Sequence, residues 1–267
     1  MKKYLSYILP LVLSACTRLP MPPVSDLEEL QFNGPVHTVA VIEQEAVDDN
    51  GRIVTLDTLT NRIITFTPEG LVDSVVHESG VERYHYVPGK RTIERLDIDG
   101  EPDHNEIATF DVHGDLIEWE MVAPEGRLMS GEEYRYQDRR CIEKKVLSED
   151  GASLICRDYR YDEAGHLLAY NAYNPDGSLN YGWQCTCDTA GRLLTEQWLD
   201  TDGSVMSTSI YTYCADGLKE SEQTDLTRVE YTYELDSYGN YTTRVATFYS
   251  PGMNPNYIIT HREIQYY

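Results

Sequence analysis

The sequence predicts an all-β protein, in which β-hairpin repeats form an antiparallel meander arranged as a single extended or curled sheet. Two observations carry this prediction. Glycine-containing turns recur with a period of about 25 residues, and apolar and polar residues alternate between those turns. The sequence contains no long amphipathic helical period.

Two sets of turns define the repeat. An aromatic residue precedes a glycine by four positions at Phe66/Gly70, Phe110/Gly114, Tyr161/Gly165 and Tyr213/Gly217. Further glycines follow one another at intervals of 26, 25, 26 and 26 residues, at Gly100, Gly126, Gly151, Gly177 and Gly203. Because glycine readily supplies the positive φ of a tight turn, each unit should form one hairpin. We therefore expect turns near residues 100, 126, 151, 165, 177, 191, 203 and 217.

The segments between the turns have the alternation of strands with one buried face. Between residues 178 and 187 the odd positions carry aromatic, aliphatic or thiol side chains, and the even positions carry polar residues or glycine. The return segment 193–199 has apolar residues at both parities, so its inner face is not assigned. Residues 36–47 and 257–267 are predicted to be the opening and closing strands of the domain.

The N-terminus has the features of a bacterial lipoprotein signal. Two lysines are followed by an apolar stretch over residues 4–13, which has the length of a signal-peptide core rather than of a membrane-spanning helix. The next residues, Leu13-Ser14-Ala15-Cys16, resemble the bacterial lipobox, which implies cleavage before Cys16 and acylation of its thiol, for example with palmitate. The alternative is that Cys16 is an ordinary thiol in a different kind of signal peptide or signal anchor.

These features divide the chain into three parts. Residues 1–16 are the signal peptide, which ends at the lipidated Cys16. Residues 17–30 contain three prolines and are predicted to be a tether, and residues 31–267 form the repeat domain. Loss of the two signal lysines would take the formal net charge from −23 to −25. Nucleic acid and anionic headgroups are poor partners for such a surface.

Five cysteines follow Cys16, at Cys141, Cys156, Cys185, Cys187 and Cys214. The number is odd, so at least one of them cannot pair with another of the five, and the sequence does not define their disulfide pairing. Cys185 and Cys187 lack the two-residue gap of a redox or zinc motif. They stand where other units have aromatic residues, which favours a packing role.

The repeat resembles the tyrosine-aspartate (YD) repeats of RHS-type proteins. Tyr161-Asp162-Glu163-Ala164-Gly165-His166-Leu167 and Cys187-Asp188-Thr189-Ala190-Gly191-Arg192-Leu193 carry the resemblance. Residues 31–267 are similar, more narrowly, to repeat-bearing lipoproteins of Bacteroidota. The departures are Arg140, which replaces an expected glycine, and the 223–228 turn, which lacks Asp-Gly. The resemblance implies an open meander rather than a closed shell, and it implies no chemistry.

We assign no catalytic residue, metal site or cofactor from the sequence. The seven histidines stand singly, without the spacing of metal ligands. Residues 97–101 and 200–203 resemble fragments of calcium loops. From Asp97, however, the sixth and twelfth positions are Pro102 and Ala108 instead of glycine and glutamate. Asp-Gly turns explain these aspartates, whereas a carboxylate pair drawn from distant strands stays open.

Aromatic residues are the one compositional excess with functional meaning. The chain has 21 tyrosines and 3 tryptophans. A shared parity predicts one aromatic stripe that contains Tyr181, Trp183, Tyr211 and Tyr213, together with Tyr159 and Tyr161. Such a stripe could be a platform for a sugar or peptide, or it could be packed core. We favour core packing, because the repeat needs a packed face before it can display one.

Three functions compete. The leading hypothesis is a non-enzymatic lipoprotein of the outer membrane or cell surface that binds a glycan or an envelope protein, or serves as a scaffold. Thr17 rather than an acidic residue follows Cys16, which by analogy with Gram-negative sorting favours the outer membrane. The alternatives are an enzyme that acts on an envelope polysaccharide and a partner associated with a toxin or defence system.

Overall fold

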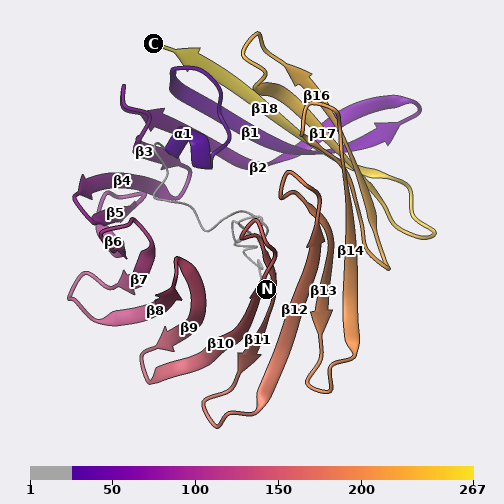
Figure 1. The fold of residues 1–267 in the computed structure, drawn as a ribbon. Helices are drawn as coiled ribbons and strands as arrows, with labels where there is room; N and C mark the ends of the chain where they lie inside the picture. The colour runs from indigo at the N-terminus through magenta and orange to yellow at the C-terminus, as the bar shows by residue number, and fades with distance from the viewer. Residues whose placement is uncertain (1–25) are drawn as a thin grey trace, which may run out of the picture.

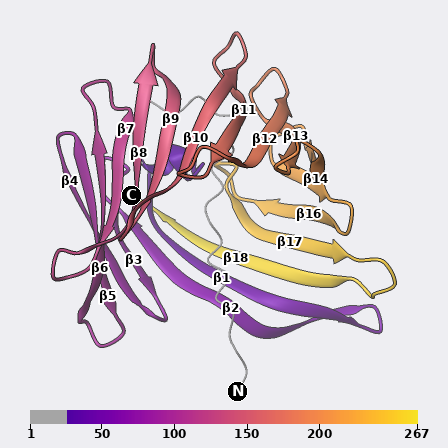
Figure 2. The same cartoon turned by 90° about the horizontal axis from the view of Figure 1, so that it is seen from below.

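The computed structural model describes residues 26–267, which form one antiparallel β-sheet and one short helix, α1 (Asp26–Glu29). The strands follow one another around a ring (Figures 1 and 2). Each strand pairs with the strands before and after it in the sequence. The prediction of an all-β antiparallel meander is therefore confirmed.

The eighteen strands alternate in direction around the ring. The first nine are β1 (Val36–Asp49), β2 (Arg52–Phe66), β3 (Val72–His77), β4 (Gly80–Val87), β5 (Lys90–Asp97), β6 (Pro102–Phe110), β7 (Leu116–Val122), β8 (Leu128–Gln137) and β9 (Arg140–Ser148). The second nine are β10 (Gly151–Tyr161), β11 (Leu167–Tyr173), β12 (Leu179–Cys187), β13 (Leu193–Leu199), β14 (Val205–Tyr213), β15 (Lys219–Gln223), β16 (Arg228–Leu235), β17 (Tyr241–Tyr249) and β18 (Asn256–Tyr266).

The sheet closes on itself, and this corrects the predicted single extended or curled sheet. The first strand, β1, pairs with the last, β18, from Val36 opposite Tyr266 to Val47 opposite Asn256. The sheet is therefore an 18-stranded barrel. Closure gives partners to backbone N–H and C=O groups that an open meander would leave exposed on its two edge strands. The alternation of residues along each strand is local and does not reveal this pairing.

The predicted turns are confirmed at all eight positions. The glycines there have φ between 79° and 107°. Most of these turns share one hydrogen-bond pattern, shown by Asp188, whose carbonyl accepts from the Gly191 N–H at 3.0 Å and whose N–H donates to the Arg192 carbonyl at 2.9 Å. This is a type I turn followed by a left-handed residue, a common three-residue hairpin loop. This recurring turn geometry explains why glycine appears at the same point of each repeat.

The turn at Arg140 shows how the repeat does without its glycine. Asp138 and Arg139 both have positive φ, 50° and 62°, and Gln137 pairs directly with Arg140. The loop is therefore two residues long and has the signs of a type I′ turn. Shortening the loop moves the left-handed positions to an aspartate and an arginine, so that Arg140 already belongs to β9.

One core cluster lies where α1 meets the strands that close the barrel. Its buried members are Phe32, Val36, Val39, Val41, Ile64, Phe66 and Val72. Leu27 and Leu30 pack against them, and the Asp26 carboxylate accepts hydrogen bonds from the Val72 N–H at 2.6 Å and from the Tyr86 hydroxyl. Residues 26–30, which we assigned to the tether, therefore belong to the folded domain. A four-residue helix is too short to give a detectable periodicity.

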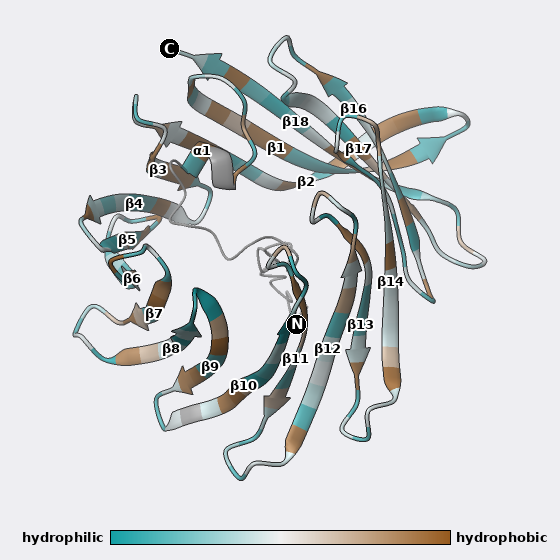
Figure 3. Ribbon diagram, viewed as in Figure 1, coloured by the Kyte–Doolittle hydropathy of each residue, from teal (hydrophilic) through white to brown (hydrophobic). Residues whose placement is uncertain are grey.

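Hydropathy alternates along many of the strands (Figure 3). Val39 and Val41 of β1 are buried, whereas Ile42, which directly follows Val41, is 39% exposed. Successive side chains thus point to opposite faces, and one face of the sheet carries most of the buried residues. No helix among residues 26–267 is long and apolar enough to cross a membrane.

Phe66 provides a test of this packing. Its side chain is 1% exposed and meets the Phe32 ring edge-on, with the centroids 5.9 Å apart. We expect Phe66→Ala to lower the free energy of unfolding by about 3–5 kcal/mol, because it leaves a cavity in the core. Urea denaturation measures the effect, and Val112→Ala, at a side chain that is 95% exposed, is the control. Equal stabilities of the two variants would contradict the packing.

Candidate functional site

The predicted aromatic residues lie together on one face of β10 to β14. The Tyr159 ring stacks on Tyr161 and on Tyr170, with centroids 6.4 and 5.6 Å apart. Tyr170 in turn stacks on Trp183 at 5.4 Å. The register places Tyr170 directly opposite Trp183 on neighbouring strands, so their side chains share a face. We call this side of the sheet the aromatic face.

Trp183 belongs to the core of this face. Its side chain is 2% exposed, and its Nε1–H donates to Glu196 Oε1 at 2.8 Å. Glu196 is also buried, and its Oε2 accepts from the Tyr211 hydroxyl at 2.8 Å. Two aromatic side chains thus provide hydrogen bonds to one buried carboxylate, which offsets part of its desolvation cost. In this state Trp183 and Tyr211 present little surface to a ligand.

Three tyrosines tie their strands to the preceding strand through their hydroxyl groups. The Tyr136, Tyr161 and Tyr213 hydroxyls donate to the carbonyls of Leu116, Cys141 and Leu193, which lie twenty residues earlier, at 2.7–2.9 Å. In the unit where Cys185 and Cys187 replace the aromatic residues, Cys185 Sγ lies 3.2 Å from the Leu167 carbonyl. The thiol therefore takes over a contact of the repeat.

The thiols of Cys141, Cys156 and Cys185 are packed rather than poised for reaction. Cys141 and Cys156 are buried and free, and burial raises the pKa of Cys141 to about 11. Burial also raises the pKa of Cys156 and, to about 12, that of Cys185. Because the thiolate is the reactive form, these shifts make the three cysteines poor nucleophiles at neutral pH.

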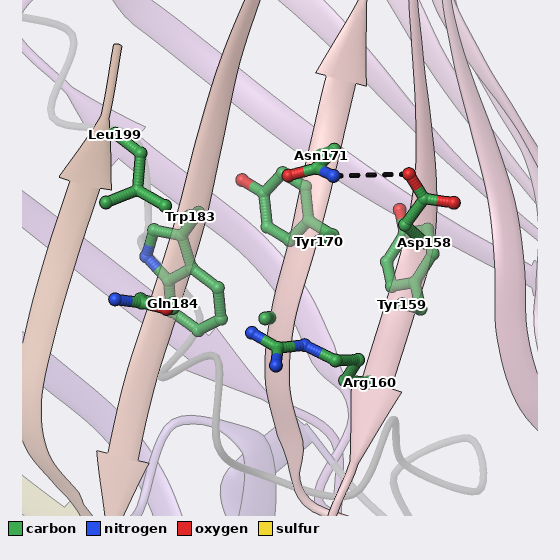
Figure 4. Close-up of a pocket in the computed structure, with 9 residues that line it drawn as sticks. Asp158, Tyr159, Arg160, Tyr170, Asn171, Trp183, Gln184 and Leu199 are labelled. Carbon is green, nitrogen blue, oxygen red and sulfur yellow. Dashed lines mark hydrogen bonds between the residues drawn. The ribbon is translucent and has the colours of Figure 1, made fainter. Parts of the chain in front are cut away.

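The opposite face of β10 to β13 contains a pocket of about 410 Å³ (Figure 4). Four neighbouring strands contribute to it, and the small Ala169 pairs with two other lining residues, Arg160 and Gln184. Its volume lies within the range of ligand sites, roughly 300–1,000 Å³. The lining residues are Asp158, Tyr159, Arg160, Ala169, Tyr170, Asn171, Trp183, Gln184 and Leu199.

Hydrogen-bonding side chains surround this pocket. Asn171 Nδ2 donates to Asp158 Oδ2 at 3.2 Å, and Gln184 Nε2 donates to Gln197 Oε1 at 2.8 Å. Asp158 has a φ of 59° and lies where the pairing of β10 with β11 is interrupted. Such a bulge redirects a side chain, here toward Asn171. The pocket can therefore offer a carboxylate, two amides and the Arg160 guanidinium to a polar ligand.

Sequence reasoning did not identify the polar residues of this pocket. Of the predicted stripe, Trp183 borders the pocket, but its ring points to the aromatic face, and Tyr181, Tyr211 and Tyr213 do not line the pocket. The even-numbered polar positions of residues 178–187 were the available signal, because Gln184 is one of them. The bulge at Asp158 had no such signal.

The aspartates that resembled calcium ligands bind their own turns. Asp97 Oδ1 accepts from the N–H groups of Asp99 and Glu101, both at 2.9 Å. The same arrangement recurs at Asp188, where the Arg192 N–H above all holds the carboxyl pKa below its usual value. No cluster of three or more possible metal ligands occurs among residues 26–267. The predicted lipidation site, Cys16, lies outside the described residues.

Comparisons with known proteins give no family for the chain. No family model matches it, and no curated protein matches it. It is similar to a porin-like protein from Bacteroides uniformis, with 12% identity over 87% of this chain and 99% of that chain, at a TM-score of 0.49. For a porin-like protein from Bacteroides vulgatus the values are 11%, 87%, 99% and 0.36.

Replacing Trp183 distinguishes a packed aromatic face from a displayed one. We expect Trp183→Ala to cost about 3–5 kcal/mol, because the side chain is buried and its loss leaves Glu196 with one donor fewer. Thermal unfolding measures this cost, with Thr186→Ala, at an exposed site of the same strand, as the control. A shift of the melting temperature under about two degrees would mean that the face is not core.

Proposed function

We propose that this chain is a lipid-anchored protein of the bacterial envelope that binds a neutral glycan, without catalysis, in the pocket formed by β10 to β13. The observation that carries the proposal is the composition of the pocket wall. Asp158, Asn171 and Gln184 supply hydrogen-bonding groups around the small Ala169 and beside Leu199. Carboxylates and amides pair with sugar hydroxyls, and Leu199 adds apolar surface.

Charge favours a neutral ligand in this pocket. Its wall contains one carboxylate, Asp158, and one guanidinium, Arg160. The chain as a whole has a formal charge of −23, which repels polyanions at a distance. Neutral oligosaccharides are therefore the ligand class that the pocket suits best.

The pocket wall also favours binding over hydrolysis. A glycosidase of the common kind needs two carboxyl groups on either side of the scissile bond, about 5–9.5 Å apart. The pocket wall has only Asp158. Glu196, the buried carboxylate of the neighbouring strand, faces Trp183 and Tyr211 and is not part of the wall.

We also propose that the chain has a lipid anchor and that its hairpins are related to a known repeat. Lipid on Cys16 would hold the domain on the outer membrane or cell surface, and residues 17–25 would link it to the barrel. The hairpins would be a divergent form of the tyrosine-aspartate repeat. Two recurring contacts support this kinship: the tyrosine hydroxyl on a carbonyl, as in Tyr213, and the aspartate on its own turn, as in Asp188.

Glycan binding can be tested with the detergent-purified, full-length protein on an array of neutral oligosaccharides. We expect at least one saturable ligand and a loss of affinity of about tenfold or more in Asp158→Gly, because hydrogen bonds to a charged group contribute about 1.5–3 kcal/mol. Glycine suits the φ of 59° at this position and avoids strain. Gln184→Ala should have a smaller effect of the same sign.

The matched control is Asn180→Ala, which changes an exposed amide on β12 that does not line the pocket. Its affinity should equal that of the unmodified protein. Absence of any glycan ligand, or equal affinity in Asp158→Gly, would refute the assignment of the pocket.

The anchor has its own test. Cys16→Ser removes the thiol that acylation requires, so we expect the protein to move from the membrane to the soluble fraction. Incorporation of radiolabelled palmitate should disappear in the same variant, whereas Cys214→Ser should keep its label. Label that persists in Cys16→Ser would contradict lipidation at this residue.

A further inference from the structure

The strands that close the barrel gather three arginines on one face. Arg62 of β2 and Arg262 of β18 both pair with Val41 of β1, so these side chains point to the same side of the sheet. Arg244 of β17 pairs with Thr260, two residues from Arg262 and therefore on the same face. The chain has 45 acidic residues and only 22 lysines and arginines, so this grouping runs against its composition.

Arg262 is the centre of the group. Its guanidinium carbon lies 3.5 Å from the centroid of the Tyr241 ring and 4.9 Å from that of Phe32. Among residues 26–267 its guanidinium has no carboxylate at ion-pair distance and donates no hydrogen bond, and its Nε is buried. Two rings thus contact a cation whose five N–H donors have no acceptor in the described part of the chain.

Glu43, the carboxylate that pairs with Arg244, is already engaged. Glu43 Oε1 accepts from Arg244 Nη2 at 2.9 Å and from the Thr260 hydroxyl at 3.0 Å. Arg62 also lacks an ion pair within residues 26–267. Two of the three positive charges are therefore uncompensated by the described residues. Burial, above all, lowers the pKa of Arg262 to about 10, and Arg244 and Arg62 act in the same direction, so Arg262 stays charged at neutral pH.

We propose that Arg262, flanked by Arg62 and Arg244, is a binding site for an oxyanion, the carboxylate or phosphate group of an acidic ligand. A guanidinium presents parallel N–H groups that match both anions in a bidentate fashion. The rings of Tyr241 and Phe32 contact the cation and restrict its motion before a ligand binds, which lowers the entropy that binding costs. The site is separate from the pocket of β10 to β13 and does not depend on glycan binding.

The test is isothermal titration of the full-length protein with inorganic phosphate and, separately, with glucuronate. We expect saturable binding of at least one of them, and the tighter of the two identifies a phosphate or a carboxylate ligand. Arg262→Gln should weaken that binding at least tenfold, and Arg62→Gln should weaken it by a smaller factor. Arg228→Gln, at an exposed arginine of β16 that pairs with Glu230, should leave it unchanged.

Stability separates a binding role from a packing role. Without added anion, Arg262→Gln should melt at or above the temperature of the unmodified protein, because it removes a half-buried charge that no carboxylate among residues 26–267 neutralises. A lower melting temperature together with unchanged anion binding would overturn the proposal, as would the absence of saturable binding to both probes. If Arg262→Gln does not fold, Arg62→Gln decides, because Arg62 is exposed and equal binding in that variant would overturn the site.

Discussion

The pairing of β1 with β18 is the constraint on which the rest of the structure depends. Every other pairing joins strands that are neighbours in the sequence and that a turn already holds close together. The β1–β18 ladder instead joins the two ends of the described chain and removes both edges of the sheet. Asn240 strengthens this junction, since its side chain accepts from the Asn33 N–H at 2.7 Å and donates to the Asn33 carbonyl at 2.8 Å.

Contacts of the repeat fix the register of neighbouring strands in this ring. Along a flat strand, a slip of one residue would move every side chain to the other face. The hydroxyl of Tyr161 on the Cys141 carbonyl fixes the position of one hairpin against the preceding one, and that of Tyr213 on the Leu193 carbonyl does the same two units later. The tyrosines that make the sequence conspicuous thus serve the register of the sheet, and this role competes with their exposure to a ligand.

The two faces of the sheet consequently offer different side chains to a ligand. The aromatic face is filled by rings and by the buried Glu196. Near the β1–β18 ladder the same face carries the Arg262 guanidinium, whose buried Nε has no hydrogen-bond partner in the described part of the chain. The opposite face has two small residues, Ala169 and Gly182, which leave room between longer polar neighbours. A Cβ on Gly182 would lie only 3.1 Å from Asn171 Oδ1, so the glycine also lets that amide approach the strand.

The sequence by itself determined the turns, the alternation and the aromatic side of the strands, because each depends on local conformation. Glycine at Gly191 permits the positive φ, Asp188 caps the turn, and a period of two separates Trp183 from Gln184. Only the tertiary structure decided that the meander closes, since closure results from the twist summed over many strands. It also decided which residues meet at the bulge of Asp158 and around Arg262, because those neighbours come from different strands whose register no local pattern specifies.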